Sequence, residues 1–506
     1  MKKYLILTLF LVFVLPVYSQ NSDDGNIKEL TILHWNDFHA RNMPYTISKK
    51  DSTGEKKNIF VGGTASLLGY VNKYRNDNSL LLNGGDEYQG TPISSITKGF
   101  SQVQLLNLFK LDAFVLGNHD FDYGMYTLDS ALQLANYKYL SANLYIKNKK
   151  RTFGKPYIIK DINGIKIGII GVSPIELMTL TLPKNVSDIQ LLNTDSVITA
   201  DAKELKKEKC NLIILLSHNG EDVDKKFAEK HPKDINIIIG GHSHTPIFKP
   251  EVINGVLVCQ AGSYGRWLGK LDLKIDVKKD SVISYFGKLI ETDFDSTIYD
   301  KPAEEKVESM LAAIEPEMKR PIGKVLADWK KNALGQWEAD AIKDIIKTDM
   351  SFLNSGSIRK DMLAGDITIG DVWEINPFGN SMMKFSVSGK TLRQMVSNML
   401  SASSRDDNIL LSGIYIQYDS RLMKDGTPDF ITSMKINGKD FDENSSYTIS
   451  TNNYVVSQLK KYFGEIPEEI KAEDTNILDR DLIIEAVEKQ KEINPVFEKR
   501  IVDIGK

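Results

Sequence analysis

The chain has 506 residues, of which 42% are hydrophobic and 26% are charged. This composition is typical of a globular protein, and the length favours two or three domains over a single core. The 64 basic and 67 acidic residues leave a formal net charge of -3, so the overall charge supports neither a nucleic acid nor an anionic membrane as a partner.

The first 19 residues have the pattern of a signal peptide. Lys2-Lys3 forms a charged start, an apolar run covers residues 4–14, and Ser19 supplies a small residue at a cleavage site. The run is short for a membrane span, so a cleaved signal peptide is favoured and an uncleaved membrane anchor is the alternative. No cysteine directly follows the run, so lipid attachment is not supported. We expect a periplasmic or extracellular chain that begins at Gln20 and has no transmembrane segment in its mature part.

The chain contains two cysteines, Cys210 and Cys259. This number excludes a disulfide-rich scaffold and a cysteine-based zinc finger. Each lies beside an apolar, strand-like run, so a disulfide formed after export and two buried free thiols are both open.

Five short apolar runs, each predicted to be a strand, end in residues that can bind metals. Amphipathic segments at 65–74 and 200–208 have helical spacing, as expected for helices that connect parallel strands. The carboxyl ends of such strands share one edge of a sheet, where ligands bind. The runs cover residues 30–33, 80–82, 113–116, 212–216 and 235–239.

Histidine is concentrated at these strand ends. Of the 7 histidines, only His34 and His231 lie elsewhere. One histidine alone would often be a structural residue, but the set indicates a functional site. The strand-end histidines are His39, His119, His218, His242 and His244.

These residue types suit a centre of two divalent metal ions. Imidazole, carboxylate and amide ligands without thiolate are compatible with Zn, Mn or Fe. Two such ions would carry more positive charge than two carboxylates offset, so the centre would attract a phosphate and provide hydroxide for in-line attack on phosphorus. Gly84-Gly85 and Gly240-Gly241 would let the backbone turn sharply near the metals. The expected ligands are Asp37, His39 and His244 for one ion, Asn118, His218 and His242 for the other, and Asp86 as a bridge.

These motifs resemble the ordered motif set of the calcineurin-like metallophosphoesterases. The matching residues are Asp37-Phe38-His39, Gly85-Asp86, Gly117-Asn118-His119-Asp120, His218 and Gly241-His242-Ser243-His244. Residues 33–37, 86–91, 121–124 and 140–143 are similar to the secreted 5′-nucleotidase branch. Residues 354–359 and 376–380 resemble the C-terminal substrate-binding domain of that branch, so the likeness covers nearly the whole mature chain.

The resemblance implies an α/β architecture of two domains. After the signal peptide at 1–19, a four-layer α/β/β/α catalytic sandwich would cover residues 20–300 and an α/β 5′-nucleotidase-type domain residues 321–506. Apolar positions at helical spacing in the segment 302–319 predict a linker helix over residues 301–320. By analogy, the C-terminal domain would rotate about this linker to carry substrate toward the metals.

The resemblance also assigns roles around the second metal. His119 would face the substrate, where it stabilises the transferring phosphoryl group or protonates the leaving oxygen. Asp122 would orient His119, with Asp120 as the other candidate and a simple turn role as the alternative for Asp122. In the C-terminal domain, Asn354 and Arg359 are the expected substrate-binding residues, and Arg359 could bind an anionic group through two hydrogen bonds.

The chain departs from the branch at the nucleobase site. Relatives place the base between two aromatic rings, but here the first position is Asn408 and residues 457–460 replace the second motif. Ser388 stands where relatives often have an arginine. Because stacking contributes about 1–3 kcal/mol per base, we expect weaker base selection, unless Tyr462 or Phe463 substitutes rather than packing in the core.

The sequence therefore predicts an exported two-metal phosphoesterase that acts on a small phosphorylated substrate, first of all a 5′-nucleotide. Cyclic nucleotides, sugar nucleotides, sulfur-containing substrates and non-nucleotide phosphates are alternative substrates. A non-catalytic metal-binding surface protein is the alternative from another class, although such a protein would have no need of His119. The sequence does not predict the metal or the oligomeric state.

Overall fold

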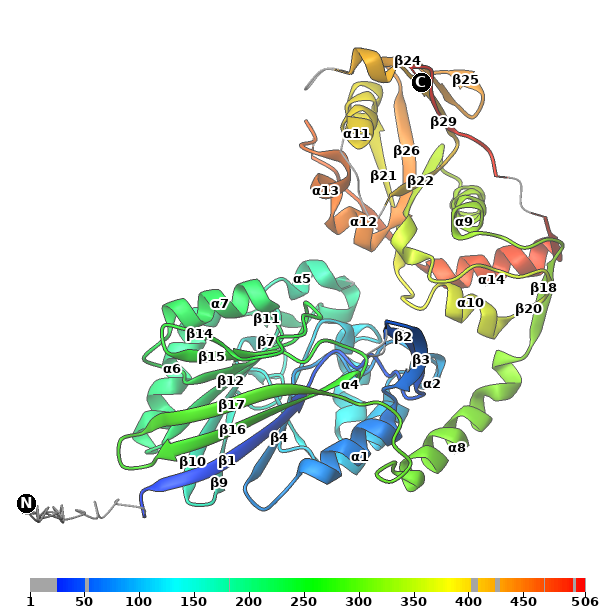
Figure 1. The fold of residues 1–506 in the computed structure, drawn as a ribbon. Helices are drawn as coiled ribbons and strands as arrows, with labels where there is room; N and C mark the ends of the chain where they lie inside the picture. The colour runs from blue at the N-terminus through cyan, green and yellow to red at the C-terminus, as the bar shows by residue number, and fades with distance from the viewer. Residues whose placement is uncertain are drawn as a thin grey trace, which may run out of the picture.

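The computed structural model describes residues 25–505 apart from 51–53, 182, 402–407, 424–427, 468 and 495–496. The predicted signal peptide at 1–19 lies outside the described residues. Two α/β parts are joined by the long helix α8 (Lys301–Met318), as Figure 1 shows. No helix within the described ranges is long and apolar enough to span a membrane.

Two six-stranded sheets form the centre of the N-terminal part, with orders β17-β16-β1-β4-β5-β6 and β14-β15-β13-β12-β10-β9. The first comprises β17 (Ser281–Glu291), β16 (Trp267–Asp276), β1 (Ile27–Trp35), β4 (Ser79–Asn83), β5 (Ala113–Val115) and β6 (Lys138–Leu140). The second comprises β14 (Glu251–Ile253), β15 (Val256–Cys259), β13 (Ile237–Ile239), β12 (Leu212–Ser217), β10 (Ile165–Val172) and β9 (Tyr157–Ile162).

The apolar residues of these strands alternate between separate cores. On β1, Ile32 packs into the core between the two sheets, whereas Leu33 packs against helices. The central strands of each sheet are therefore covered on both faces, and the predicted α/β/β/α order of layers is confirmed (Figure 1). The covering helices are α1 (Thr64–Tyr74), α3 (Phe100–Phe109) and α4 (Met125–Leu132) on the first sheet, and α6 (Thr194–Lys207) and α7 (Glu221–Lys230) on the second.

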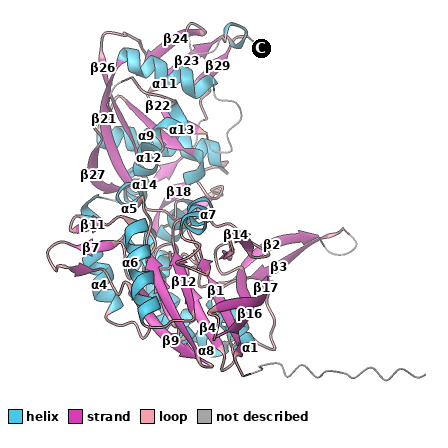
Figure 2. Ribbon diagram, turned by 90° about the vertical axis from the view of Figure 1, so that its left-hand side faces the viewer, coloured by secondary structure: helices cyan, strands magenta, loops and turns pink. Residues whose placement is uncertain are grey.

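Smaller elements surround this sandwich. The hairpin of β2 (Tyr45–Lys50) and β3 (Lys56–Val61) projects from the N-terminal part, as Figure 2 shows. A three-stranded sheet has the order β11-β7-β8. The remaining elements of this part are α2 (Pro92–Ile96), β7 (Leu144–Ile146), β8 (Arg151–Thr152), α5 (Leu177–Leu180) and β11 (Ile189–Leu191).

The parallel strands explain why the polar residues after them meet. Strand β1 runs parallel to β4, β4 to β5, and β12 to β13. All residues of β12 are buried, as expected for a strand covered on both faces. Because parallel strands run in the same direction, their carboxyl ends lie at one edge of the sheet. The residues that follow these strands therefore lie together at that edge.

The C-terminal part contains three sheets, with orders β22-β19-β26-β21-β27, β25-β24-β23-β29 and β20-β18-β28. Its strands are β18 (Pro321–Val325), β19 (Met350–Asn354), β20 (Gly365–Thr368), β21 (Ser381–Ser388), β22 (Ile409–Ser412), β23 (Ile414–Tyr418), β24 (Ile431–Ile436), β25 (Lys439–Asp440), β26 (Ser446–Asn452), β27 (Glu473–Leu478), β28 (Glu492–Ile493) and β29 (Ile501–Asp503). Its helices are α9 (Lys331–Ile346), α10 (Ile369–Ile375), α11 (Gly389–Ser401), α12 (Asn453–Ser457), α13 (Leu459–Phe463) and α14 (Asp479–Gln490).

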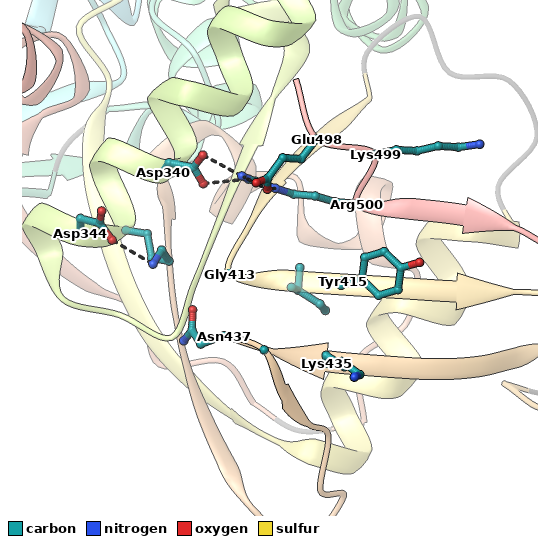
Figure 3. A pocket seen from close by; sticks show the side chains of 12 residues that line it. Asp340, Asp344, Gly413, Tyr415, Lys435, Asn437, Glu498, Lys499 and Arg500 are labelled. Carbon is teal, nitrogen blue, oxygen red and sulfur yellow. Dashed lines mark hydrogen bonds and ion pairs between the residues drawn. The ribbon is translucent and has the colours of Figure 1, made fainter. Parts of the chain in front are cut away.

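A cavity of about 610 Å³ in the C-terminal part is bordered by ion pairs. Arg500 donates hydrogen bonds to both carboxylate oxygens of Asp340, each 2.7 Å long, and Figure 3 shows the two side chains pointing toward each other. A third bond joins Arg500 to the carbonyl of Leu411. These contacts fasten the segment before β29 to α9, and none of the predicted ligands or substrate-binding residues lines this cavity.

The two cysteines are buried and unpaired. Cys259 packs between the two N-terminal sheets, whereas Cys210 packs under α6. Of the two possibilities left open by the sequence, the structure shows the free thiols.

Candidate metal centre

The structure brings the seven predicted metal ligands together at the carboxyl edge of the two N-terminal sheets. Each lies within a few residues of the end of a strand. Asp37 and His39 follow β1, Asp86 follows β4, Asn118 follows β5, His218 follows β12, and His242 and His244 follow β13.

One group of possible ligands consists of Asp37, His39 and His244. The Nε2 atoms of His39 and His244 lie 3.2 Å apart. Asp37 Oδ1 is 3.3 Å from His244 Nε2 and 3.9 Å from His39 Nε2. The three ligand atoms therefore converge on one point.

The second group consists of Asp86, His218 and His242. Asp86 Oδ2 lies 3.0 Å from His218 Nε2 and 4.0 Å from His39 Nε2, so this carboxylate stands between the two groups. Asn118 Oδ1 is 2.9 Å from His242 Nδ1 and adds an amide oxygen to the second group.

Within the residues that the structure describes, two buried atoms of this cluster make no hydrogen bond and face other predicted ligand atoms instead. Asp37 Oδ1 and His218 Nε2 have no hydrogen-bond partner among the described residues, and both side chains are fully buried. A buried polar atom without a hydrogen bond is costly, and one divalent ion in each ligand group would satisfy the two atoms. The nitrogen and oxygen donors fit two ions of Zn, Mn or Fe.

The pKa values of the histidines in the cluster fall into two groups. Burial lowers the pKa of His39 and of His242 to about 4, which keeps these imidazoles neutral, as metal ligands must be. Burial alone would also lower the pKa of His218, but the Asp86 and Asp37 carboxylates raise it to about 10. A metal ion at His218 Nε2 would therefore take the place of a proton.

The backbone of the cluster adopts a conformation that non-glycine residues rarely take. Five of the seven predicted ligands have a positive φ, in the left-handed region. Such conformations cost roughly 1–3 kcal/mol each and concentrate at functional sites. The residues are Asp37 (51°), His39 (51°), Asp86 (57°), His242 (82°) and His244 (56°).

Glycines let the loops approach the ligands closely. A Cβ atom on Gly117 would lie 2.1 Å from Asp86 Oδ1. A Cβ atom on Gly241 would lie 2.4 Å from the carbonyl oxygen of Gly84 and 2.8 Å from His218 Nδ1. Side chains at these positions would displace the loops that carry the ligands.

Neighbouring polar groups fix the orientation of two ligands. His218 Nδ1 donates a 2.6 Å hydrogen bond to the carbonyl of Gly84, which turns Nε2 toward Asp86. Asn36 Nδ2 donates a 2.6 Å bond to Asp37 Oδ2 and leaves Oδ1 facing the histidines. Such outer contacts set the ring orientation and the carboxylate geometry at metal sites.

His119 lies beside the cluster and is held by Asp122. Its Nδ1 atom is 2.8 Å from Asp122 Oδ2, and its ring centroid is 5.3 Å from that of His39. The side chain is 33% exposed, so it can reach a substrate. Burial alone would lower the pKa of His119, but Asp122 raises it to about 9.

Asp120, the other candidate for orienting His119, has a different set of contacts. Its Oδ2 atom accepts a 2.7 Å hydrogen bond from the Gly117 amide, and its Oδ1 atom accepts bonds of 2.9 and 3.1 Å from the amides of Glu87 and Tyr88. Asp120 therefore holds the loop that carries Asp86, and Asp122 is the carboxylate at His119.

The predicted substrate-binding residues lie in the C-terminal part. Asn354 ends β19, and its Oδ1 atom accepts a 3.0 Å bond from Asn452. The guanidinium of Arg359 lies 4.8 Å from the centre of the Phe378 ring.

A contact that the sequence did not predict connects this region to the metal centre. Gln89 Nε2 donates bonds of 3.0 and 3.3 Å to the carbonyls of Phe378 and Pro377. Gln89 lies three residues after Asp86, within a motif that carried the family resemblance. Its place in that motif is the feature of the sequence that could have marked it as a functional residue. The segment that holds Phe378 therefore touches the loop of a predicted ligand.

Tyr462 and Phe463 do not form a base-binding surface. Their exposed fractions are 0% and 1%, and both belong to the C-terminal core with Phe352. The core role is the one that the structure shows, so neither ring replaces the missing aromatic residues.

The fold and this cluster define a class of protein. Residues 30–246 match the model of the calcineurin-like phosphoesterases, a class of metal-dependent hydrolases of phosphoric esters. Residues 318–465 match the model of the 5′-nucleotidase C-terminal domain. The chain therefore contains a calcineurin-like phosphoesterase domain followed by a 5′-nucleotidase C-terminal domain.

Known proteins match most of the chain. The 5′-nucleotidase of Vibrio cholerae serotype O1 is 27% identical over 479 residues, which cover 83% of this chain and 83% of that protein. The endonuclease YhcR of Bacillus subtilis is 26% identical over 465 residues, 85% of this chain but only 37% of the relative's length. The crystal structure of a 5′-nucleotidase precursor from Thermus thermophilus has a TM-score of 0.71 at 24% identity and covers 95% of this chain and 100% of that one. These matches confirm the predicted family resemblance and fold class. They also confirm the prediction of a metal-dependent hydrolase of phosphoric esters.

Proposed function

We propose that this protein is an exported phosphoesterase that hydrolyses small phosphate esters, first of all 5′-nucleotides, with two bound divalent ions. The observation that carries this proposal is the convergence of two ligand groups on Asp86 beside the His119–Asp122 pair. The 5′-nucleotidase name of the Vibrio cholerae relative supports the substrate class.

The chain would hold the two ions through the ligand groups described above. Asp37, His39 and His244 would bind the first ion, and Asn118, His218 and His242 the second, with Asp86 shared. When bound, the two ions supply positive charge to the phosphoryl group and lower the pKa of a water molecule toward neutrality. The identity of the ions is left to measurement, because Zn, Mn and Fe all suit these donors.

His119 would act on the substrate as a proton donor. The Asp122 carboxylate accepts the hydrogen bond of Nδ1, so Nε2 faces away from it and can donate a proton or a hydrogen bond. As the oxygen of water bonds to phosphorus and the ester P–O bond breaks, the leaving oxygen takes a proton from His119. General acid catalysis of this kind contributes about 10²–10⁴-fold.

A second candidate function is hydrolysis of phosphate esters without selection for a nucleobase. The burial of Tyr462 and Phe463 favours it, because neither ring can stack on a base. Cyclic nucleotides and sugar nucleotides are the other substrates to distinguish.

A substrate panel tests these functions. The purified mature protein would be assayed with Zn, Mn or Fe against nucleoside monophosphates, cyclic nucleotides, sugar nucleotides and 4-nitrophenyl phosphate. We expect metal-dependent phosphate release, with 5′-nucleotides the best substrates. Activity on the aryl phosphate without any nucleotide preference would remove the nucleotide assignment. No activity with any metal would leave the non-catalytic alternative.

Export is tested separately, because the signal-peptide residues lie outside the described part of the chain. We expect chains recovered from the periplasm or the medium to begin at Gln20 by N-terminal sequencing. Recovery of a chain that begins at Met1 in the cytoplasmic fraction would contradict export.

A further inference from the structure

Arg41 lies at the rim of the metal centre between two tyrosine rings. Its Cζ atom is 4.4 Å from the centre of the Tyr45 ring and 5.1 Å from that of Tyr264. The two rings are nearly perpendicular, at 88°. Cation–π contacts with both rings therefore hold the planar guanidinium in one place.

Tyr264 joins this guanidinium to the metal ligands. Its ring centroid is 5.8 Å from that of His39 and 5.5 Å from that of His244. Its backbone amide donates a 2.8 Å hydrogen bond to the carbonyl of Asp37. The positive charge of Arg41 thus lies one aromatic ring away from two predicted ligands of the same ion.

Tyr45 supports Arg41 from the other side and is itself fixed. It is the first residue of β2, in the hairpin that projects from the N-terminal part (Figure 2). A Cβ atom on Gly62 would lie 2.9 Å from the Tyr45 ring, so the ring packs directly on the backbone of that glycine.

The hydrogen-bonding groups of the Arg41 side chain are free within the described part of the chain. No hydrogen bond or ion pair there involves its guanidinium, although the residue is half-buried. Arg266, by contrast, donates bonds of 3.0 and 2.8 Å to Glu291. An arginine presents five donors and binds phosphate through two parallel bonds. An uncommitted arginine at the rim of a phosphate site is therefore suited to an anion.

We propose that Arg41 is a specificity residue that binds a second phosphate group of the substrate, next to the phosphate that is hydrolysed. This inference rests on the proposed function and narrows it to phosphate esters with more than one phosphate, such as nucleoside diphosphates. The position explains the role: Arg41 is separated from the metal ligands by Tyr264, so it would reach a neighbouring phosphate rather than the reacting one.

Two substrates and a matched variant test the proposal. ADP carries a second phosphate and 4-nitrophenyl phosphate does not, so kcat/KM is measured for both with the wild type, Arg41→Ala, Arg41→Gln and Arg266→Ala. Arg266→Ala is the control. It also removes one positive charge, but from a guanidinium that is already paired with Glu291. Metal content and Tm are measured for every variant, so that a misfolded protein is recognised.

We expect both Arg41 variants to lower kcat/KM for ADP at least about tenfold more than for 4-nitrophenyl phosphate, as the loss of charged hydrogen bonds implies. Arg266→Ala should change the two values equally. An unchanged ratio in Arg41→Ala and Arg41→Gln, or the same change of ratio in Arg266→Ala, would overturn the inference while the phosphoesterase function stood. If the wild type hydrolysed neither substrate, the proposed function itself would fail and the inference with it.

Discussion

At the scale of single residues, the division of roles between Asn118 and His119 can be tested by substitution. We predict that His119→Ala retains both metal ions but lowers kcat at least about 100-fold, because His119 would act on the substrate. Metal content by mass spectrometry and kcat for a nucleoside monophosphate measure the two effects. Loss of metal from His119→Ala would show that His119 is a ligand and that the assignment is wrong.

Asp86 has a different expected signature. Its Oδ2 atom faces both ligand groups, at 3.0 Å from His218 Nε2 and 4.0 Å from His39 Nε2. We predict that Asp86→Ala loses the paired site, so that the purified variant holds fewer than two ions per chain and shows no turnover. A variant that still bound two ions would contradict the bridging role. Asp272→Ala, a substitution of a β16 carboxylate outside the cluster, is the control and should keep both ions.

The sequence identifies candidate residues through their side-chain chemistry, whereas the geometry of the loops decides their contacts. The seven candidate ligands could be identified because histidine, aspartate and asparagine side chains follow apolar runs. The choice of Asp122 over Asp120 as the partner of His119 rested on the family resemblance alone, because both carboxylates lie within three residues of His119 and only the turn places Asp122 at Nδ1. Arg41 was missed because Tyr264, one of the two rings that hold it, is distant in sequence.

At the scale of elements, the parallel strands carry most of the site. Runs such as 212–216 are apolar at every position, which predicts a strand buried on both faces, and β12 covers Leu212–Ser217. The order of strands in each sheet was not readable, because the pairing of β1 with β16 joins segments far apart in the sequence. Gln89 was missed for the same reason, since its partners are carbonyls of another domain.

Helix α9 contains a buried carboxyl that makes stability depend on pH. Glu338 is 1% exposed, and within the described chain neither carboxyl oxygen has a hydrogen-bond partner. Burial, and then the nearby Asp479 carboxylate, raise the pKa of Glu338 well above its usual value. The folded state therefore keeps a proton that the unfolded state releases, and stability falls as pH rises above the ordinary pKa of glutamate.

We predict that Glu338→Gln removes this loss. The stability of the variant relative to the wild type should increase with pH above the ordinary glutamate pKa, at up to about 1.4 kcal/mol per pH unit. Denaturant unfolding of both proteins from pH 4 to about pH 8 measures the difference. A difference that does not change with pH would contradict a buried, neutral Glu338.

At the scale of the whole molecule, the metal centre belongs to one of two parts with separate cores. Its predicted ligands follow strands of the N-terminal sheets, whereas the C-terminal part has buried clusters of its own, formed by residues from 322 onward. We predict that Mn²⁺ added to the chelated protein raises the Tm of one unfolding transition and leaves a second unchanged in calorimetry. Saturating metal should stabilise the N-terminal part by about 4 kcal/mol at a thousandfold excess over Kd. Asp86→Ala should lose the shift, and an equal shift in that variant would place the metal elsewhere.

The two-metal centre is tested most directly by titrating the chelated protein with Zn, Mn or Fe while the hydrolysis of 4-nitrophenyl phosphate is followed. With at least one of these metals, we predict no turnover in the metal-free chain and a rate that rises until two equivalents are bound per chain. Full activity without metal, or a rate that is complete at one equivalent with every metal, would contradict the two-metal centre formed by Asp37, His39, Asp86, Asn118, His218, His242 and His244.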